Sequence, residues 1–283
     1  MGRIRRGWQL TKESWAVVRA DRSLLVFPVV SGIAGLLVLA AFGGGAAALY
    51  SSTDSEPAAI VILVVGVYVL IVAALFCNVA LTACAARALE GEDTTPGEGF
   101  AAARARMGQI LGWAGLQLVI GALISAVQAL LREAGAGVVG AIVGGLANFA
   151  WNVATFFVVP VIALEGLGPK AALQKSIHVI RQRWGEGVVG SAAIGGLVFL
   201  FAFLPGAALV AGGIALGDAA GWVLVAIGAA IFVVGVVAQS ALMAVFKVAL
   251  YRYATEDVVI GPFQREQLEA AFAPRGRRRA AAV

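Results

Sequence analysis

Six long apolar runs constrain this chain more than any other feature of its sequence. An α-helix needs about 20 apolar residues to cross the roughly 30 Å hydrocarbon core of a membrane, and each run is long enough. The runs are Leu24–Leu49, Ala58–Ala86, Gly108–Leu131, Gly137–Leu164, Val188–Leu216 and Ala219–Leu250. The longest of them indicate tilted or kinked helices rather than additional spans. The sequence therefore predicts an all-α, polytopic membrane protein with six transmembrane helices.

The composition excludes a water-soluble fold. Hydrophobic residues make up 61% of the 283 residues and charged residues 13%, against roughly 45–50% and about 25% in soluble proteins. A soluble domain cannot bury so much apolar surface. The net charge of +5 does not indicate nucleic-acid binding, because no basic soluble domain is predicted that would carry it.

The basic residues predict the orientation of the spans. All of them except Arg132 lie in the first 23 residues, in the loops after the second and fourth spans, or from the end of the sixth span onward. Because cytoplasmic loops are enriched in Lys and Arg, we expect both termini to be cytoplasmic, in the plasma membrane. The predicted organisation is a cytoplasmic amphipathic helix in 1–23, a six-helix domain in 24–250 and a basic cytoplasmic tail in 251–283, disordered at its end.

Three segments on the predicted cytoplasmic side are amphipathic. Their apolar faces comprise Ile4, Trp8, Thr11, Trp15 and Val18; Phe100, Ala103, Met107 and Ile110; and Leu173, Ile177, Ile180 and Trp184. Tryptophan beside Lys and Arg suits the headgroup layer, which makes Trp8, Trp15 and Trp184 candidate interfacial anchors. Two interpretations remain open: a docking platform at the membrane surface, or linker helices that only anchor the bundle. The sequence favours the linkers.

A weak internal similarity suggests three hairpin pseudo-repeats. The segment Ser14–Arg19 resembles Ser176–Arg181, and each segment precedes a span that is followed by a return span. The segment around Phe100 fits this order by pattern but not by letters. Repeats of one orientation are related by an axis along the membrane normal.

Four stretches carry a resemblance to a known family. They are Gly2–Pro28, Leu89–Glu92 leading to Trp113, Val159–Pro169 continuing to Ser176 and Trp184-Gly185, and Ala249–Thr255. Through them the chain resembles an uncharacterised family of six-span bacterial membrane proteins. The stretch 168–184 is faintly similar to membrane domains attached to glycerophosphodiester phosphodiesterases, whose catalytic domain has no counterpart here. The resemblance implies a fold and a location and no activity.

No motif predicts catalysis. Two G-x-G-x-x-G strings, at 135–140 and 185–190, open predicted spans and do not follow a strand, as a dinucleotide site requires; close helix packing explains them better. The single histidine, His178, has no carboxylate or thiol spaced to complete a metal site. We therefore predict no catalytic residues, no metal and no cofactor, and a protein that is not an enzyme.

Amide side chains within the spans form a candidate polar core. The residues are Asn78, Gln117, Asn148, Asn152 and Gln239. A polar cavity for a small solute or lipid headgroup is one interpretation, and interhelical hydrogen bonding is the other and favoured one. At the predicted inner mouth, Glu165 is expected to pair with a basic residue of the helix that follows.

These observations predict a non-enzymatic membrane protein that acts through lipid or protein contacts on its cytoplasmic face. The alternative is a permease or flippase for a small solute or lipid, with the amide-lined core. Membrane lipids are the predicted partners. The tail arginines are expected to contact anionic lipids; they are Arg275, Arg277, Arg278 and Arg279. The sequence predicts no nucleic-acid partner and no particular oligomeric state.

Overall fold

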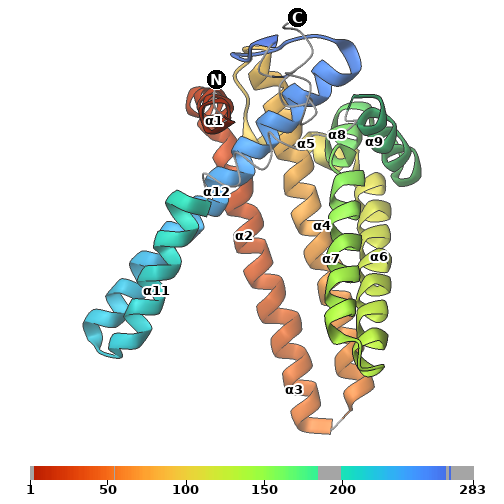
Figure 1. The fold of residues 1–283 in the computed structure, drawn as a ribbon, viewed down its shortest axis with the longest axis vertical. Helices are drawn as coiled ribbons and strands as arrows, with labels where there is room; N and C mark the ends of the chain where they lie inside the picture. The colour runs from red at the N-terminus through yellow and green to blue at the C-terminus, as the bar shows by residue number, and fades with distance from the viewer. Residues whose placement is uncertain (1–2, 54, 184–198, 266–267, 269–283) are drawn as a thin grey trace, which may run out of the picture. The chain divides into compact units, whose positions relative to one another are not determined.

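The computed structural model describes residues 3–53, 55–183, 199–265 and 268, and every regular element in these ranges is helical (Figure 1). The described part of the chain contains six helical stretches long and apolar enough to cross a membrane. They are Arg22–Ser52, Glu56–Leu89, Met107–Glu133, Gly137–Glu165, Phe199–Leu216 and Ala219–Glu256. The predicted all-α, six-span membrane fold is confirmed. The predicted start of the fifth span, at Val188, lies outside the described residues.

Contacts divide the chain into two compact units. The first contains the described parts of 1–28, 84–95 and 182–283, and the second contains 29–83 and 96–181, apart from residue 54. Helices α2 (Val26–Val38) and α4 (Glu56–Leu89) run from one unit into the other. Each unit is described by itself below.

The core of the first unit is the C-terminal part of the sixth span. This span is the single helix α12 (Ala219–Glu256), and it packs against α1 (Arg3–Ala20) and the 3₁₀ turn η1 (Arg22–Leu25). The fully buried side chains here include Leu24, Phe27, Phe246, Leu250 and Tyr251. Helix α12 continues six residues past the predicted end of the span at Leu250, because Tyr251 and Tyr253 are still part of this apolar core.

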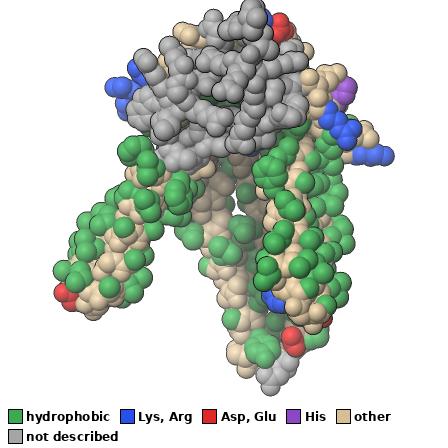
Figure 2. Space-filling model, in the orientation of Figure 1, with side chains coloured by type: hydrophobic (Ala, Val, Ile, Leu, Met, Phe, Trp, Pro, Cys, Tyr) green, Lys and Arg blue, Asp and Glu red, His purple; other side chains and the backbone are tan. Residues whose placement is uncertain are grey.

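Glycines allow the fifth and sixth spans to pack as a tight hairpin. The fifth span contains the π-helical turn η3 (Phe199–Phe203) and α11 (Leu204–Leu216), which runs beside the first half of α12 (Figure 1). A Cβ on Gly206 would lie 3.0 Å from the carbonyl oxygen of Gly228, and one on Gly213 would overlap the carbonyl oxygen of Gly221. The outward side chains of the hairpin are hydrophobic (Figure 2), as contact with lipid requires.

The turn of this hairpin lies at the predicted break. Gly217 ends α11 with φ of +69°, a left-handed conformation that favours glycine. Asp218 then caps α12, because its carboxylate accepts a hydrogen bond from the backbone N–H of Gly221 at 2.7 Å.

The second unit holds the remaining hairpins. The first span continues through the π-helical turn η2 (Leu39–Gly43) and α3 (Gly44–Thr53) and returns as α4. Helix α5 (Pro96–Ala105) leads into α6 (Met107–Glu133), which is antiparallel to α7 (Gly137–Ala154) (Figure 1). Helices α8 (Val158–Glu165) and α9 (Pro169–Arg183) follow. Each of the three hairpins is thus preceded by a short helix, whereas their origin as pseudo-repeats stays a prediction.

Close contacts at glycines also hold α6 and α7 together. Gly140 and Gly144 are buried on α7, and a Cβ on Gly140 would lie 3.1 Å from the Cβ of Leu131. Near the other end of this pair, the rings of Trp113 and Trp151 stack with centroids 5.8 Å apart.

All three expected amphipathic segments differ from the prediction. Helix α1 buries Leu10, Ser14, Val17 and Val18, while Trp15, expected on the apolar face, is 43% exposed. The buried face of α1, which packs on α12, is therefore rotated relative to the predicted face. The segment 100–110 is not one helix: α5 ends at Ala105 and α6 begins at Met107, with Arg106 at φ −107° and ψ 16° between them. In α9 the buried residues are Ala172, Ser176, Val179 and Ile180, whereas Leu173 and Ile177 of the expected face are half-buried.

Candidate functional site: polar networks at the charged ends of the spans

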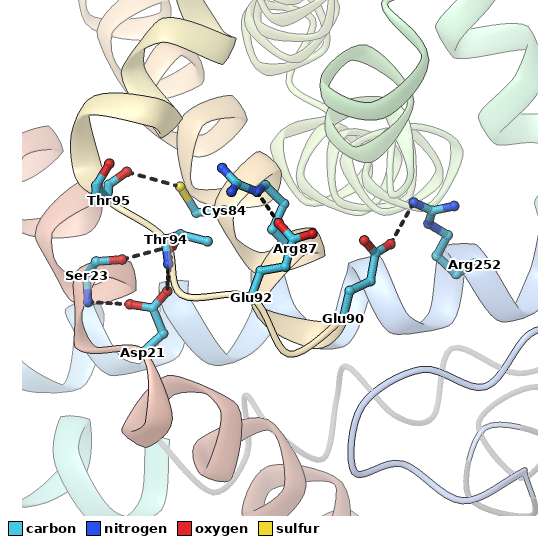
Figure 3. A network of polar contacts seen from close by, with 9 residues as sticks. All are labelled: Asp21, Ser23, Cys84, Arg87, Glu90, Glu92, Thr94, Thr95 and Arg252. Atoms are coloured by element: carbon cyan, nitrogen blue, oxygen red, sulfur yellow. Dashed lines mark hydrogen bonds and ion pairs between the residues drawn. The ribbon is translucent and has the colours of Figure 1, made fainter.

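A hydrogen-bonded latch joins the entry of the first span to the loop between α4 and α5 (Figure 3). Asp21, between α1 and η1, accepts the backbone N–H of Ser23 through Oδ1 at 2.9 Å. Its Oδ2 accepts the Thr94 hydroxyl at 2.5 Å and the Thr94 backbone N–H at 3.3 Å. Thr94 is only 8% exposed, and its hydroxyl also lies 3.1 Å from that of Ser23. One carboxylate therefore fixes two loops that are distant in sequence.

Ion pairs continue this network along the same loop (Figure 3). Arg87, in the last turn of α4, pairs with Glu92 at 2.7 Å. Glu90 pairs with Arg252 of α12 at 3.2 Å, and Arg252 also binds Glu256 at 2.9 Å. All these side chains are partly exposed, so each pair contributes only about 0–1 kcal/mol. Together they fix the position of the loop on α12.

The chain beyond α12 folds back on the helix. Asp257 ends α12 in a left-handed conformation with φ of 57°. Its carboxylate pairs with Arg265 at 3.2 Å, and the guanidinium of Arg265 lies 5.8 Å from the centroid of the Tyr253 ring. Phe263 and Leu268 are buried. The described start of the segment predicted as a tail is therefore an ordered part of the first unit.

In the second unit, a buried serine satisfies a break in the fourth span. Helix α7 ends at Ala154 and α8 begins only at Val158; the backbone N–H groups of Phe156 and Val158 bond to carbonyl oxygens three residues earlier instead of four. Ser176 of α9, which is fully buried, donates its hydroxyl to the carbonyl oxygen of Ala154 at 2.7 Å. The same hydroxyl accepts the backbone N–H of Phe157 at 3.2 Å. Helix α9 is thus held directly on the break.

A second polar cluster surrounds the turn between α8 and α9. Gly166 ends α8 with φ of +66°, and its carbonyl oxygen accepts a hydrogen bond from Gln109 Nε2 at 3.2 Å. The guanidinium of Arg106 occupies the space where a Gly166 side chain would lie. Glu165 pairs with Lys175 of α9, with Nζ and Oε2 2.5 Å apart. This is the type of partner expected for Glu165 from the sequence.

The structure places the five candidate amides on four helices, with Asn148 and Asn152 together on α7, and divides them between the units. Gln239 lies in the first unit, and the other four lie in the second. Asn78 and Asn148 are exposed and donate to carbonyl oxygens one turn earlier in their own helices, those of Ala74 and Gly144, both at 2.9 Å. Asn152 is exposed and Gln117 is half-buried. A common amide core stays a prediction.

Two other groups of predicted residues are only partly covered by the structure. Trp15 is exposed on α1. The side chain of Trp8 and all of Trp184 lie outside what the structure describes, as do the tail arginines at 275 and 277–279. Among the described residues, no group of three His, Cys, Asp or Glu side chains is arranged to hold a metal ion.

The sequence did not identify the residues that organise the two polar clusters, one around Asp21 and Thr94 and the other around Ser176 and Gly166. Asp21 could have been predicted as a helix cap, because Asp is favoured directly before a helix, where its carboxylate accepts a backbone N–H two residues later, here that of Ser23. Thr94 and Ser176 carried no such signal, since their partners are distant in sequence.

Comparison with known proteins shows the family of the chain. Residues 57–261 match the profile of a family described as “Family of unknown function (DUF6159)”. The chain belongs to this family. No curated protein and no solved structure matches it. The DUF6159 match runs from the second span to the turn after α12, so it includes the loop of Thr94, the break of the fourth span, Ser176 and Arg252.

Proposed function

We propose that this DUF6159 protein is a non-enzymatic component of the cytoplasmic membrane that acts through lipid or protein contacts on its cytoplasmic face. The observation that supports the proposal is that side-chain hydrogen bonds and ion pairs hold the polar connecting segments in fixed positions. Asp21, Thr94 and Arg252 tie one set of connecting segments together, and Ser176 and Gln109 tie another. Preorganised surfaces lose less entropy on binding than flexible loops do.

The orientation within this proposal follows from charge. The polar segments just described carry the Lys and Arg residues, whereas the turns at the other ends of the spans carry Arg132 alone. Under the positive-inside rule, both termini and the two polar clusters face the cytoplasm. Labelling of single cysteines at Ser52 and Asp93, in a background without Cys77 and Cys84, tests this. We expect a membrane-impermeant thiol reagent to label position 52 in intact cells and position 93 only in inverted vesicles.

A genetic comparison tests the mode of action. In a deletion strain, whichever phenotype the deletion causes is scored after complementation. We expect Trp15→Ser to lose complementation, because Trp15 lies on the exposed face of α1. The double change Asn148→Leu and Asn152→Leu is expected to retain it. The opposite pattern would contradict the proposal and favour transport.

The second candidate function is a permease or flippase that uses the amides. One observation favours it: the fourth span is interrupted at 155–157, about one helical turn after Asn152. Interrupted spans are typical of transporters. Asn148 and Asn152 are also exposed on one face of α7. Cysteines at positions 148, 152 and 239 test it, because aqueous labelling from either side of the membrane requires a water-filled path.

The faint resemblance of stretch 168–184 to membrane domains of glycerophosphodiester phosphodiesterases bears on the proposal in one respect. It concerns α9, and it is compatible with a position of this helix at a phospholipid surface. No catalytic role for this chain follows from it.

A further inference from the structure

Helix α1 presents one exposed stripe that combines an aromatic ring with positive charge. The stripe consists of Lys12, Trp15, Arg19 and Arg22, all exposed. At about 100° per residue, Lys12, Trp15 and Arg19 point within about 60° of one another. Arg22, the first residue of η1, follows after the extended Asp21 and is also exposed. We call these four residues the α1 stripe.

The rest of the unit fixes the direction in which the α1 stripe points. The opposite face of α1 buries Leu10, Ser14, Val17 and Val18, and α1 packs on α12. Helix α1 therefore cannot turn Trp15 inward without exposing these side chains. An exposed Trp held between cations is an unfavourable surface in bulk water but a favourable one in the headgroup layer, where one part of the ring is apolar and the other is wet.

The acidic residue nearest in sequence to Arg19 and Arg22 is Asp21, and it forms no ion pair with either of them among the described residues. Both carboxylate oxygens of Asp21 are engaged by Ser23 and Thr94. Within the part of the chain that the structure describes, no ion pair is seen for Lys12, Arg19 or Arg22. Among the described residues, nothing therefore pairs with the positive charges of the stripe.

Chain connectivity places the α1 stripe at the membrane surface. The first span begins at Arg22 and α1 ends at Ala20, so Trp15 lies five residues, or about 7.5 Å along α1, from the point at Asp21 where the chain turns into the span. A headgroup layer adds roughly 5–7 Å on each side of the hydrocarbon core. Headgroups are therefore within reach of the long Lys and Arg side chains.

We propose that the α1 stripe binds anionic phospholipid headgroups, with Lys12, Arg19 and Arg22 on the phosphates and the Trp15 ring among the glycerol groups. The inference rests on the proposed function and names its partner. Lipid is favoured over a protein because the stripe is a convex helix face and because its charge complements an anionic leaflet. A protein partner is an outcome of the test below.

The test compares association of spin-labelled phosphatidylglycerol and phosphatidylcholine with the full-length protein in bilayer nanodiscs. We expect the wild type to prefer phosphatidylglycerol and to lose the preference as salt rises. The triple variant Lys12→Gln, Arg19→Gln, Arg22→Gln is expected to lower the preference at least about fivefold, the effect of a single basic residue near an anionic surface. The reference is Arg132→Gln, at the far end of α6, with no comparable loss. An unchanged preference in the triple variant would overturn the inference.

Fluorescence gives a second readout that does not depend on the charge variants. The chain has six Trp residues, so the Trp15 signal is the difference between the wild type and Trp15→Phe. We expect brominated phosphatidylglycerol to quench this signal more than brominated phosphatidylcholine does. Equal quenching by both lipids, or none by either, would overturn the inference.

The two proposals fail in different ways. If lipid preference is independent of the α1 stripe while Trp15→Ser still loses complementation, the partner is a protein, so the lipid inference is wrong and the proposed function stands. If Trp15→Ser also complements fully, α1 carries neither role. Circular dichroism and elution volume of each variant are expected to match the wild type, because all four side chains are exposed.

Discussion

The hydroxyl of Ser176 lies 2.7 Å from the carbonyl oxygen of Ala154, at the point where the fourth span is interrupted. Because it also accepts the N–H of Phe157, one side chain from α9 satisfies both sides of the interruption. An unsatisfied backbone group inside a membrane protein is costly. Helix α9 is therefore part of the structure of the span and more than a connection between hairpins.

Replacing Ser176 with Ala is expected to destabilise the protein by about 1–3 kcal/mol, because it removes the hydrogen-bond partner of a buried N–H at Phe157 and of a partly buried carbonyl oxygen at Ala154. Thermal unfolding in a fixed lipid or detergent measures the change. The matched control is Ser51→Ala, since Ser51 is exposed and bonds only within its own helix, to Ala48. Equal midpoints for the two variants would show that the bonds of Ser176 contribute nothing to stability.

The latch at Asp21 gives a second prediction. Asp21→Ala removes the acceptor for the buried Thr94 and for the N–H of Ser23, so we expect a loss of about 1–3 kcal/mol. Hydrogen exchange should accelerate at 90–95 and at 22–25 together, because one carboxylate holds both. Asp93→Ala serves as the control, since Asp93 is an exposed neighbour in the same loop. Faster exchange in only one of the two segments would argue against a shared latch.

The sequence predicted the elements of this protein better than their contacts. The six spans follow from apolar length alone, and Gly217-Asp218 signals its turn through residue types that favour a left-handed conformation and a helix cap. Helix α1 was predicted as an amphipathic helix, but of its buried residues only Val18 was predicted. Leu10 and Val17 are buried in place of Trp15, because the adjoining surface of α12 decides which side packs.

The same reason explains what was missing at the polar clusters. Ser176 and Ala154 are 22 residues apart, and Asp21 and Thr94 are 73 apart. No local pattern marks such pairs. Glu165 and Lys175 lie on consecutive helices joined by a short turn, and this proximity is what made a pairing for Glu165 predictable.

The turn between α8 and α9 allows a test of backbone and space at once. Gly166→Ala places a Cβ in a left-handed position, φ +66°, and into the guanidinium of Arg106. We expect a loss of about 1–3 kcal/mol from the backbone alone, measured as a lower unfolding midpoint. Gly168→Ala, two residues on, meets nothing within 4 Å and should be close to neutral. Combining Gly166→Ala with Arg106→Ala should recover the part of the loss that comes from the clash.

The hairpin of the fifth and sixth spans offers the sharpest comparison, because two adjacent glycines have opposite surroundings. A Cβ at Gly213 would overlap the carbonyl oxygen of Gly221 and lie 2.8 Å from Val225 Cγ2, whereas a Cβ at Gly212 meets nothing within 4 Å. Gly213→Ala must therefore separate α11 from α12, and we expect a loss of about 1–3 kcal/mol from overpacking. Gly212→Ala should instead stabilise the helix by roughly 0.5–1 kcal/mol, since Ala loses less backbone entropy than Gly. Thermal unfolding of the two variants in identical nanodiscs measures both signs. Cross-linking of a cysteine pair, one in α11 and one in α12, locates the change: we expect it to be lost in Gly213→Ala and kept in Gly212→Ala. A Gly213→Ala variant with unchanged stability and intact cross-linking would refute glycine-dependent packing of this hairpin.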